Sequence, residues 1–246
     1  MALLKFGKSK KKAAAKQQGK FIVIDGTDGS GKTTQTNLLV EELKINGYQV
    51  ETADFPQYGT KSAGLTEEYL KGKYGQVGPE AASIFYAIDR YDASFKIREW
   101  LKSGKIVVSN RYVTANAGHQ GGKISDEYDR LKFFKWLDHL EYTIFAIPKP
   151  DLNIILHVPA EVAQKLVDQK SKQDRKYVDG KKRDLHEDDL KHLKNAEKVY
   201  RQISKLFPNT KLVECVAGGK LLPPEQVHNK VWDLVRRIAL KDFKPQ

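Results

Sequence analysis

Residues 21–34 read FIVIDGTDGSGKTT, an apolar run that leads into a glycine-rich loop. The loop carries the pattern G-x-x-x-x-G-K-[S/T], with Gly26, Gly31, Lys32 and Thr33 in the fixed positions. Glycines there let backbone N–H groups turn toward a phosphate, and a following helix adds the positive end of its dipole. The stretch therefore predicts a buried strand, a phosphate-binding loop and a helix, in that order.

This loop predicts binding of a nucleoside triphosphate. A lysine at its end reaches the outer phosphates, and the hydroxyl of Thr33 is suited to Mg²⁺. We therefore expect ATP with Mg²⁺ as a partner. A glycine-rich turn that only caps a helix is the alternative, and the apolar strand before the loop disfavours it. The expected ATP contacts are all residues of the loop: Gly26, Thr27, Asp28, Gly29, Ser30, Gly31, Lys32, Thr33 and Thr34.

Apolar runs alternate with amphipathic stretches along the rest of the chain. Runs of Val, Ile and Leu without polar alternation are typical of strands buried on both faces. The pattern predicts an α/β protein with the P-loop NTPase fold, a five-stranded parallel sheet flanked by helices on both faces. The expected strands are 21–25, 48–54, 106–109, 153–158 and 211–216, and the expected helices 32–46, 79–103, 126–144, 160–170, 187–206 and 224–240.

The net charge of +12 is unevenly distributed. Residues 1–20 hold seven lysines and no acid, which leaves 36 basic against 31 acidic residues elsewhere. We expect residues 1–20 to be a disordered low-complexity tail and residues 21–246 to form one domain. Nucleic-acid binding is not expected, except through the tail.

Cysteine use and hydropathy give an expectation about the compartment. Cys215 is the one cysteine, so no intramolecular disulfide can form. No apolar run approaches the roughly 18 residues of a membrane helix, and no secretory signal follows the start. We expect a cytoplasmic protein that does not contact membranes.

Three segments are candidates for a second substrate site. They are DFPQYG at 54–59, FYAIDR at 85–90, and SNRY at 109–112, which is followed by Asn116 and HQGG at 119–122. The first and third follow predicted strands, and ligands of parallel sheets bind beyond the carboxyl ends of strands.

Helical periodicity assigns the second segment to two faces of helix 79–103. Tyr86 and Arg90 lie four residues apart on one side, where an aromatic ring beside a guanidinium suits a base and a phosphate. A surface pair with ordinary stacking is the alternative. The opposite side carries Ile84, Ile88, Tyr91 and Phe95, and we expect that side to be core.

Together these segments resemble the thymidylate kinases. The resemblance covers residue 21 to about residue 240 and rests on DGTDGSGKTTQ, DFP, FYAIDR, NRY with HQGG, and PKPDL. It implies transfer of phosphate from ATP and Mg²⁺ to dTMP, in dTTP biosynthesis, by a homodimer. Helices 79–103 and 126–144 carry apolar residues that could pair two copies or form ordinary core, among them Phe133, Phe134, Trp136 and Leu137.

The resemblance also implies roles for single residues. Asp28 would accept from the sugar 3′-hydroxyl, and Arg111 would hold the acceptor phosphate. The other implied dTMP contacts are Phe55 and Pro56 as a wall, Arg90 at the thymine, Tyr86 (or Phe85, if the register is shifted by one) stacked on the base, and Asn116 and Gln120 at its edge.

Two departures from the family pattern concern the catalytic charges. Asn110 stands where the family has an aspartate, so an acidic role there is in doubt. Gly29 stands where some members have an arginine, which implies that a lid supplies the catalytic cation. The lid is expected at about 171–186, with Arg175 and Arg183 as candidates beside Lys32 and Arg111.

Other functions remain open from the residues alone. The GTPase pattern N-K-x-D is absent, as is, after the loop, a Walker-B-like strand of four apolar residues followed by aspartate, and both absences favour a small kinase. The rivals are another P-loop nucleotide or deoxynucleoside kinase, and a non-catalytic nucleotide-binding protein tethered by its basic tail.

Overall fold

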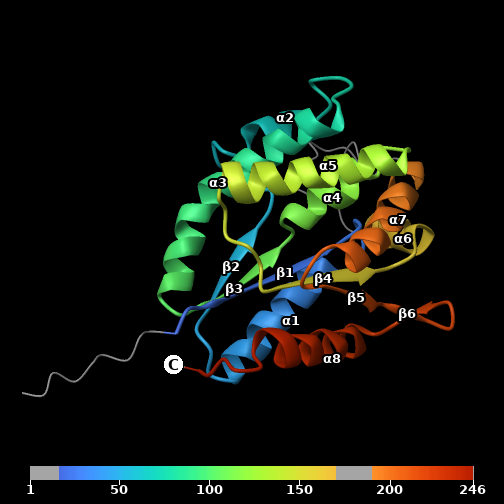
Figure 1. Ribbon diagram of the computed structural model, residues 1–246. Coiled ribbons are helices and arrows are strands. Elements are labelled where there is room, and N and C mark those ends of the chain that lie inside the picture. Colours follow the sequence, from blue (N-terminus) through green and yellow to red (C-terminus); the bar gives the residue numbers. More distant parts are fainter. Residues whose placement is uncertain (1–16, 170–189, 246) are drawn as a thin grey trace, which may run out of the picture.

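A five-stranded parallel sheet forms the centre of the molecule (Figure 1). The computed structural model describes residues 17–169 and 190–245. The strands lie in the order β2-β3-β1-β4-β5, and the α/β fold predicted from the sequence is confirmed. Their bounds are β1 (Lys20–Gly26), β2 (Val50–Asp54), β3 (Ile106–Asn110), β4 (Leu152–His157) and β5 (Thr210–Glu214).

Helices cover both faces of this sheet. α1, α8 and η3 pack on one face, and α3, α4, α5 and α7 on the other (Figure 1). A small hairpin, β6 (Val216–Ala217) and β7 (Lys220–Leu221), follows β5. The helices are α1 (Lys32–Ile45), α2 (Gly64–Leu70), α3 (Pro79–Lys102), α4 (Val113–Gly121), α5 (Glu127–His139), α6 (Ala160–Gln169), α7 (Leu190–Leu206) and α8 (Pro224–Leu234), with π-helical turns η1 (Leu140–Ile144) and η3 (Val235–Ala239).

The strand β1 explains why the sequence shows apolar runs rather than alternation. Phe21 and Val23 belong to the core under α3, α4, α5 and α7, whereas Ile22 and Ile24 belong to the core under α1 and α8. All four side chains are fully buried. Because successive residues of a strand point to opposite faces, a sheet covered on both sides selects apolar residues at every position.

The register brings three loops to one edge of the sheet. Ile24 of β1 and Asp54 of β2 both pair with Asn110 of β3. The backbone N–H of Arg111 donates to Ile24 O at 2.9 Å, and that of Phe55 to Asn110 O at 3.1 Å. The loops after β1, β2 and β3 therefore leave the sheet side by side.

Two helices at this edge were missed by the sequence analysis. α2 has only seven residues, and α4 reads VTANAGHQG, which contains two glycines and few apolar residues. Neither gives a clear period of 3.6 residues. All six predicted helices and five predicted strands form in the described part of the chain, where the ends that can be compared differ by a few residues.

One prediction about α3 is wrong. The face expected to be core is the more exposed one, with Ile84 at 38%, Tyr91 at 40% and Phe95 at 56% of their surface accessible. The face that packs inward carries small residues, and Arg90 with 1% exposure. Periodicity identifies the apolar face of a helix, but it does not show which face packs against neighbouring helices. In α3 the small side chains of the other face allow the close approach of α4 and α5.

A close contact between α4 and α7 depends on Gly118. A Cβ at this position would lie 2.5 Å from Cζ of Tyr200, and the ring of Tyr200 is buried and held by a hydrogen bond to Asp25 at 2.9 Å. Any side chain at Gly118 would therefore force the two helices apart.

We expect Gly118→Ala to destabilise the protein by about 1–3 kcal/mol, the typical cost of overpacking a core. Thermal or urea unfolding measures the change. The matched control is Gly64→Ala, because a Cβ at Gly64 has open space around it, and its effect should stay within about 0.5 kcal/mol. Equal stability of the Gly118 variant and the wild type would contradict the packing described here.

Candidate functional site

The phosphate-binding loop follows β1 as predicted and requires its glycines. Gly26 has a φ of +144°, and a Cβ there would lie 2.5 Å from Leu156 O. Gly31 precedes the first turn of α1 with a φ of +87°. Any residue other than glycine would be costly at either position. The shape of the loop therefore depends on these two glycines.

Lys32 lies across this loop and is almost completely buried. Its Nζ donates to Thr27 O at 2.8 Å and to Gly26 O at 3.1 Å, and lies 3.7 Å from Oδ1 of Asp28. Thr33, the next residue, is exposed at the start of α1. Within the described residues, the buried hydroxyls of Thr27 and Ser30 have no hydrogen-bond partner, which fits a loop built to receive oxygen atoms.

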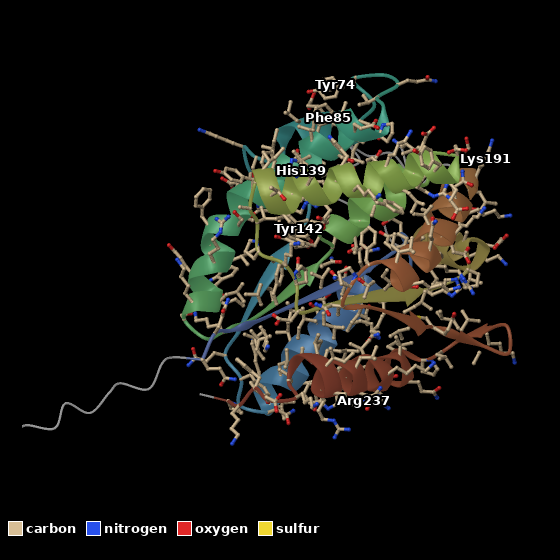
Figure 2. The ribbon with its side chains drawn as sticks, in the orientation of Figure 1. Tyr74, Phe85, His139, Tyr142, Lys191 and Arg237 are labelled. Carbon is tan, nitrogen blue, oxygen red and sulfur yellow. The ribbon has the colours of Figure 1, made fainter. Side chains whose placement is uncertain are left out.

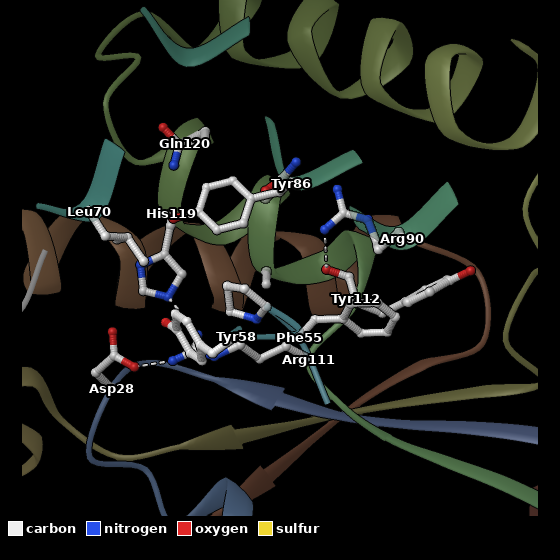
Figure 3. A pocket seen from close by; sticks show the side chains of 13 residues that line it. Asp28, Phe55, Tyr58, Leu70, Tyr86, Arg90, Arg111, Tyr112, His119 and Gln120 are labelled. Carbon is white, nitrogen blue, oxygen red and sulfur yellow. Dashed lines mark hydrogen bonds and ion pairs between the residues drawn. The ribbon is translucent and has the colours of Figure 1, made fainter. Parts of the chain in front are cut away.

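A cleft-like cavity opens beside the loop and encloses about 530 Å³ of space, part of which is continuous with the solvent. It lies at the carboxyl edge of the sheet, under α2 and between α3 and α4 (Figure 3). Every predicted dTMP contact except Phe85 lines it. The lining residues are Asp28, Phe55, Pro56, Tyr58, Leu70, Tyr86, Arg90, Arg111, Tyr112, Ala115, Asn116, His119 and Gln120.

Phe85 points away from the cavity and packs elsewhere. Its ring lies 5.5 Å from the ring of Tyr74 and 6.1 Å from that of Tyr69, between α2 and α3 (Figure 2). Tyr86 takes the place in the cavity wall. Of the two aromatic residues that the sequence left open for contact with a base, only Tyr86 is therefore in a position to make it.

Arg111 and Asp28 form an ion pair at the junction between the loop and the cavity (Figure 3). Burial alone would raise the pKa of Asp28, but the positive charges of Arg111 and Lys32 hold it well below the usual range. Arg111 has a φ of +67°, a left-handed backbone that costs energy for a residue other than glycine. Such strain is commonly retained at functional sites.

Arg90 is fixed by a partner that the sequence analysis did not identify. Glu141 of η1, fully buried, forms an ion pair with it and accepts from Nε at 3.1 Å. Burial alone would lower the pKa of Arg90, but the charge of Glu141 raises it. An acidic residue inside the apolar run LEYTIFAI (140–147) was the available signal.

Asn110 sits one strand away from a carboxylate. The carboxylate belongs to Asp54, its partner across β2 and β3. The pKa of Asp54 is raised because burial outweighs the opposing effects of Arg111 and Asn110. The Oδ1 of Asn110 is buried and has no partner among the described residues. The side-chain amide of Asn116 donates to Ser83 O at 3.1 Å. The Oε1 of Gln120 is buried and has no hydrogen-bond partner within 17–169 and 190–245, so it can still accept a hydrogen bond.

Some predicted residues fall outside the described part of the chain. Arg175 and Arg183 belong to residues 170–189, and most of the expected tail to residues 1–16. Lys20, assigned to the tail, opens β1. In the described residues no group of three or more His, Cys, Asp or Glu side chains could hold a metal, and none of the described helices is long and apolar enough to cross a membrane.

The geometry can be compared with known proteins. The thymidylate kinase family model matches residues 24–231. A probable thymidylate kinase of Thermococcus onnurineus is 30% identical over 90% of this chain and 99% of its own length. The thymidylate kinase of Mycobacterium tuberculosis strain H37Rv is 29% identical over 75% of this chain and 85% of its own.

The fold is also found in a solved structure. The thymidylate kinase of Candida albicans superposes with a TM-score of 0.68 at 22% identity, over 89% of this chain and 92% of that one. The family match spans the phosphate-binding loop and every residue that lines the cavity. The chain belongs to the thymidylate kinase family.

Proposed function

We propose that the cavity holds dTMP while the loop holds ATP. The enzyme is an ATP-dependent nucleoside monophosphate kinase that converts dTMP to dTDP in dTTP synthesis. The observation that carries the assignment of sites is Asp28, which belongs to the loop and also lines the cavity. Donor and acceptor phosphates would therefore meet where Arg111 and Lys32 lie.

The cavity offers separate groups to each part of the acceptor. Arg111 would bind the phosphate, and Asp28 would accept from the 3′-hydroxyl. Tyr86 would stack on the thymine, with Arg90 and the amides of Asn116 and Gln120 at its edge. Phe55 and Pro56 form the apolar wall.

Catalysis in this arrangement depends on positioning and on positive charge. Lys32 and Arg111 would flank the transferred phosphoryl group, and their charges stabilise the negative charge that spreads over its oxygens. The phosphate of dTMP needs no dedicated base, because its acceptor oxygen is already mostly ionised at neutral pH. Arg175 and Arg183 are proposed from the sequence alone as further cations of a lid.

Mg²⁺ fits the residues around the start of α1. The exposed hydroxyl of Thr33 is a suitable ligand. The Oδ1 of Asn110, which has no partner in the described part of the chain, could accept from a water on the ion. Bound there with ATP, the ion would neutralise charge on the outer phosphates. Asp54, the neighbour of Asn110 on β2, supplies a carboxylate next to this amide.

We also propose a homodimer that pairs through the exposed face of α3. Tyr91 lies 5.3 Å from Phe95 and 5.2 Å from Phe145, ring centre to ring centre, and Ile84 extends the same apolar surface. Of the residues named from the sequence for this role, Phe133, Phe134 and Leu137 are buried core and Trp136 packs against them. The proposed interface therefore lies on α3 with the adjacent Phe145, because the four aromatic and aliphatic residues named on α5 belong to the core or pack against it.

Lys32→Ala should reduce kcat by about 10²–10³-fold, the usual cost of removing a charge-stabilising donor. Binding of dTMP should persist, because Lys32 does not line the cavity. A coupled ADP-release assay and calorimetry with dTMP measure the two effects. Lys44→Ala, at the exposed end of α1, is the control. Full activity of Lys32→Ala, or preference of the wild type for dCMP or thymidine, would refute the assignment.

Thr33→Ala should weaken the divalent cation by about tenfold, whereas Thr33→Ser, which keeps the hydroxyl, should not. Electron paramagnetic resonance of Mn²⁺ with ADP reports binding independently of turnover. Chelation of Mg²⁺ should stop ADP release by the wild type. Unchanged Mn²⁺ affinity in Thr33→Ala would exclude Thr33 as a ligand.

Phe95→Glu should convert the dimer to a monomer, because it places a charge in the centre of the apolar α3 face. Sedimentation velocity measures the change in mass. Ile45→Glu, 80% exposed on α1 at the other face of the sheet, is the matched control. A dimer that survives Phe95→Glu would show that the copies pair elsewhere.

A further inference from the structure

Two buried histidines lie behind Arg111, and the reaction as proposed gives them no role. His119 belongs to the last turn of α4 and lines the cavity, whereas His192 belongs to the first turn of α7 and does not. Their accessible fractions are 6% and 8%. Burying two imidazoles is costly unless their nitrogens are hydrogen-bonded, so their partners identify what they do.

The close packing of α4 on α7 brings the two rings together. Gly118 and Gly122 leave no room for a side chain, since a Cβ would lie 2.5 Å from the ring of Tyr200 and 3.0 Å from Ala196 N respectively. The rings of His119 and His192 stack at 5.6 Å, and Nδ1 of His119 lies 3.3 Å from Nε2 of His192.

His119 also reaches Arg111. Its Nε2 lies 3.4 Å from Nη1 of the guanidinium (Figure 3). Asp28 binds the same guanidinium through Nη2. Arg111 is therefore held at two of its nitrogens, by a carboxylate of the loop and by an imidazole of α4.

The direction of these hydrogen bonds fixes the tautomer of His119. A guanidinium only donates, so Nε2 of His119 must accept from Arg111. The proton of the neutral ring is then on Nδ1, and it donates to Nε2 of His192. The donor of each hydrogen bond is therefore fixed: Arg111 donates to His119, and His119 donates to His192.

We propose that His119 is a positioning residue that holds Arg111 in the cavity, and that His192 holds His119 in the tautomer this requires. These two hydrogen bonds orient the guanidinium for the acceptor phosphate, and of the two histidines only His119 lines the cavity. The contact of His192 with His119 links it to Arg111 and so to the substrate. The inference rests on the assignment of the cavity as the dTMP site.

The experiment compares His192→Leu with His192→Gln. Leucine removes the acceptor for Nδ1–H of His119, and glutamine retains one. We expect His192→Leu to raise the KM and the Kd for dTMP about tenfold, as for loss of a hydrogen bond to a functional group, with the KM for ATP unchanged. His192→Gln should largely restore both values. His139→Leu, at an exposed histidine of α5, is the control.

A structural role would give a different result. If both His192 variants change dTMP and ATP kinetics equally, or neither changes dTMP binding, the proposal is wrong. If His119→Gln weakens dTMP binding while His192→Leu does not, His119 contacts the substrate itself, which also overturns it.

The tautomer can be read without any variant or ligand. Two-bond ¹H–¹⁵N correlation spectra of the wild type should find neutral His119 protonated at Nδ1, and protonation at Nε2 would overturn the proposal. This measurement also separates two failures. If the wild type does not bind dTMP, the assignment of the cavity fails, and the tautomer still decides whether His119 accepts from Arg111.

Discussion

The position of β1 between β3 and β4 is the constraint on which the site depends. Parallel pairing places the carboxyl ends of all three strands at one edge, so the phosphate-binding loop after β1 and Arg111 after β3 become neighbours. The N–H of Arg111 then bonds to Ile24 O of β1. At Arg111 the chain turns from this bond into α4. The left-handed backbone of Arg111 costs energy, and it brings the side chain to Asp28.

Charge is arranged around this edge in pairs rather than in a patch. Asp28 balances Arg111 and Lys32, and Glu141 balances Arg90 inside the protein. A buried ion pair is weak support for stability, because desolvation offsets much of the attraction. Its value here is geometric, since a guanidinium held on one side by a carboxylate presents its remaining N–H groups in a fixed direction.

The sequence predicted those parts of the site that depend on local pattern. The loop after β1 is specified by its glycines, because its backbone is left-handed or closely packed at those positions. The strands are specified by apolar runs. It missed α4, whose glycines serve contact with α7 rather than helix propensity. It also reversed the faces of α3, because hydrophobic periodicity does not report whether small residues or large ones meet the neighbouring helix.

The sequence by itself determined the class of sheet, the nucleotide loop and most of the residues that line the cavity. Only the tertiary structure decided which of them meet. Tyr86 lines the cavity and Phe85 does not, Glu141 fixes Arg90, and His192 reaches His119 from α7. The reason is physical. Local pattern follows from interactions between residues close in the chain. These contacts instead join residues separated by as many as 73 positions. They depend on how helices pack together, which the sequence of one segment does not show.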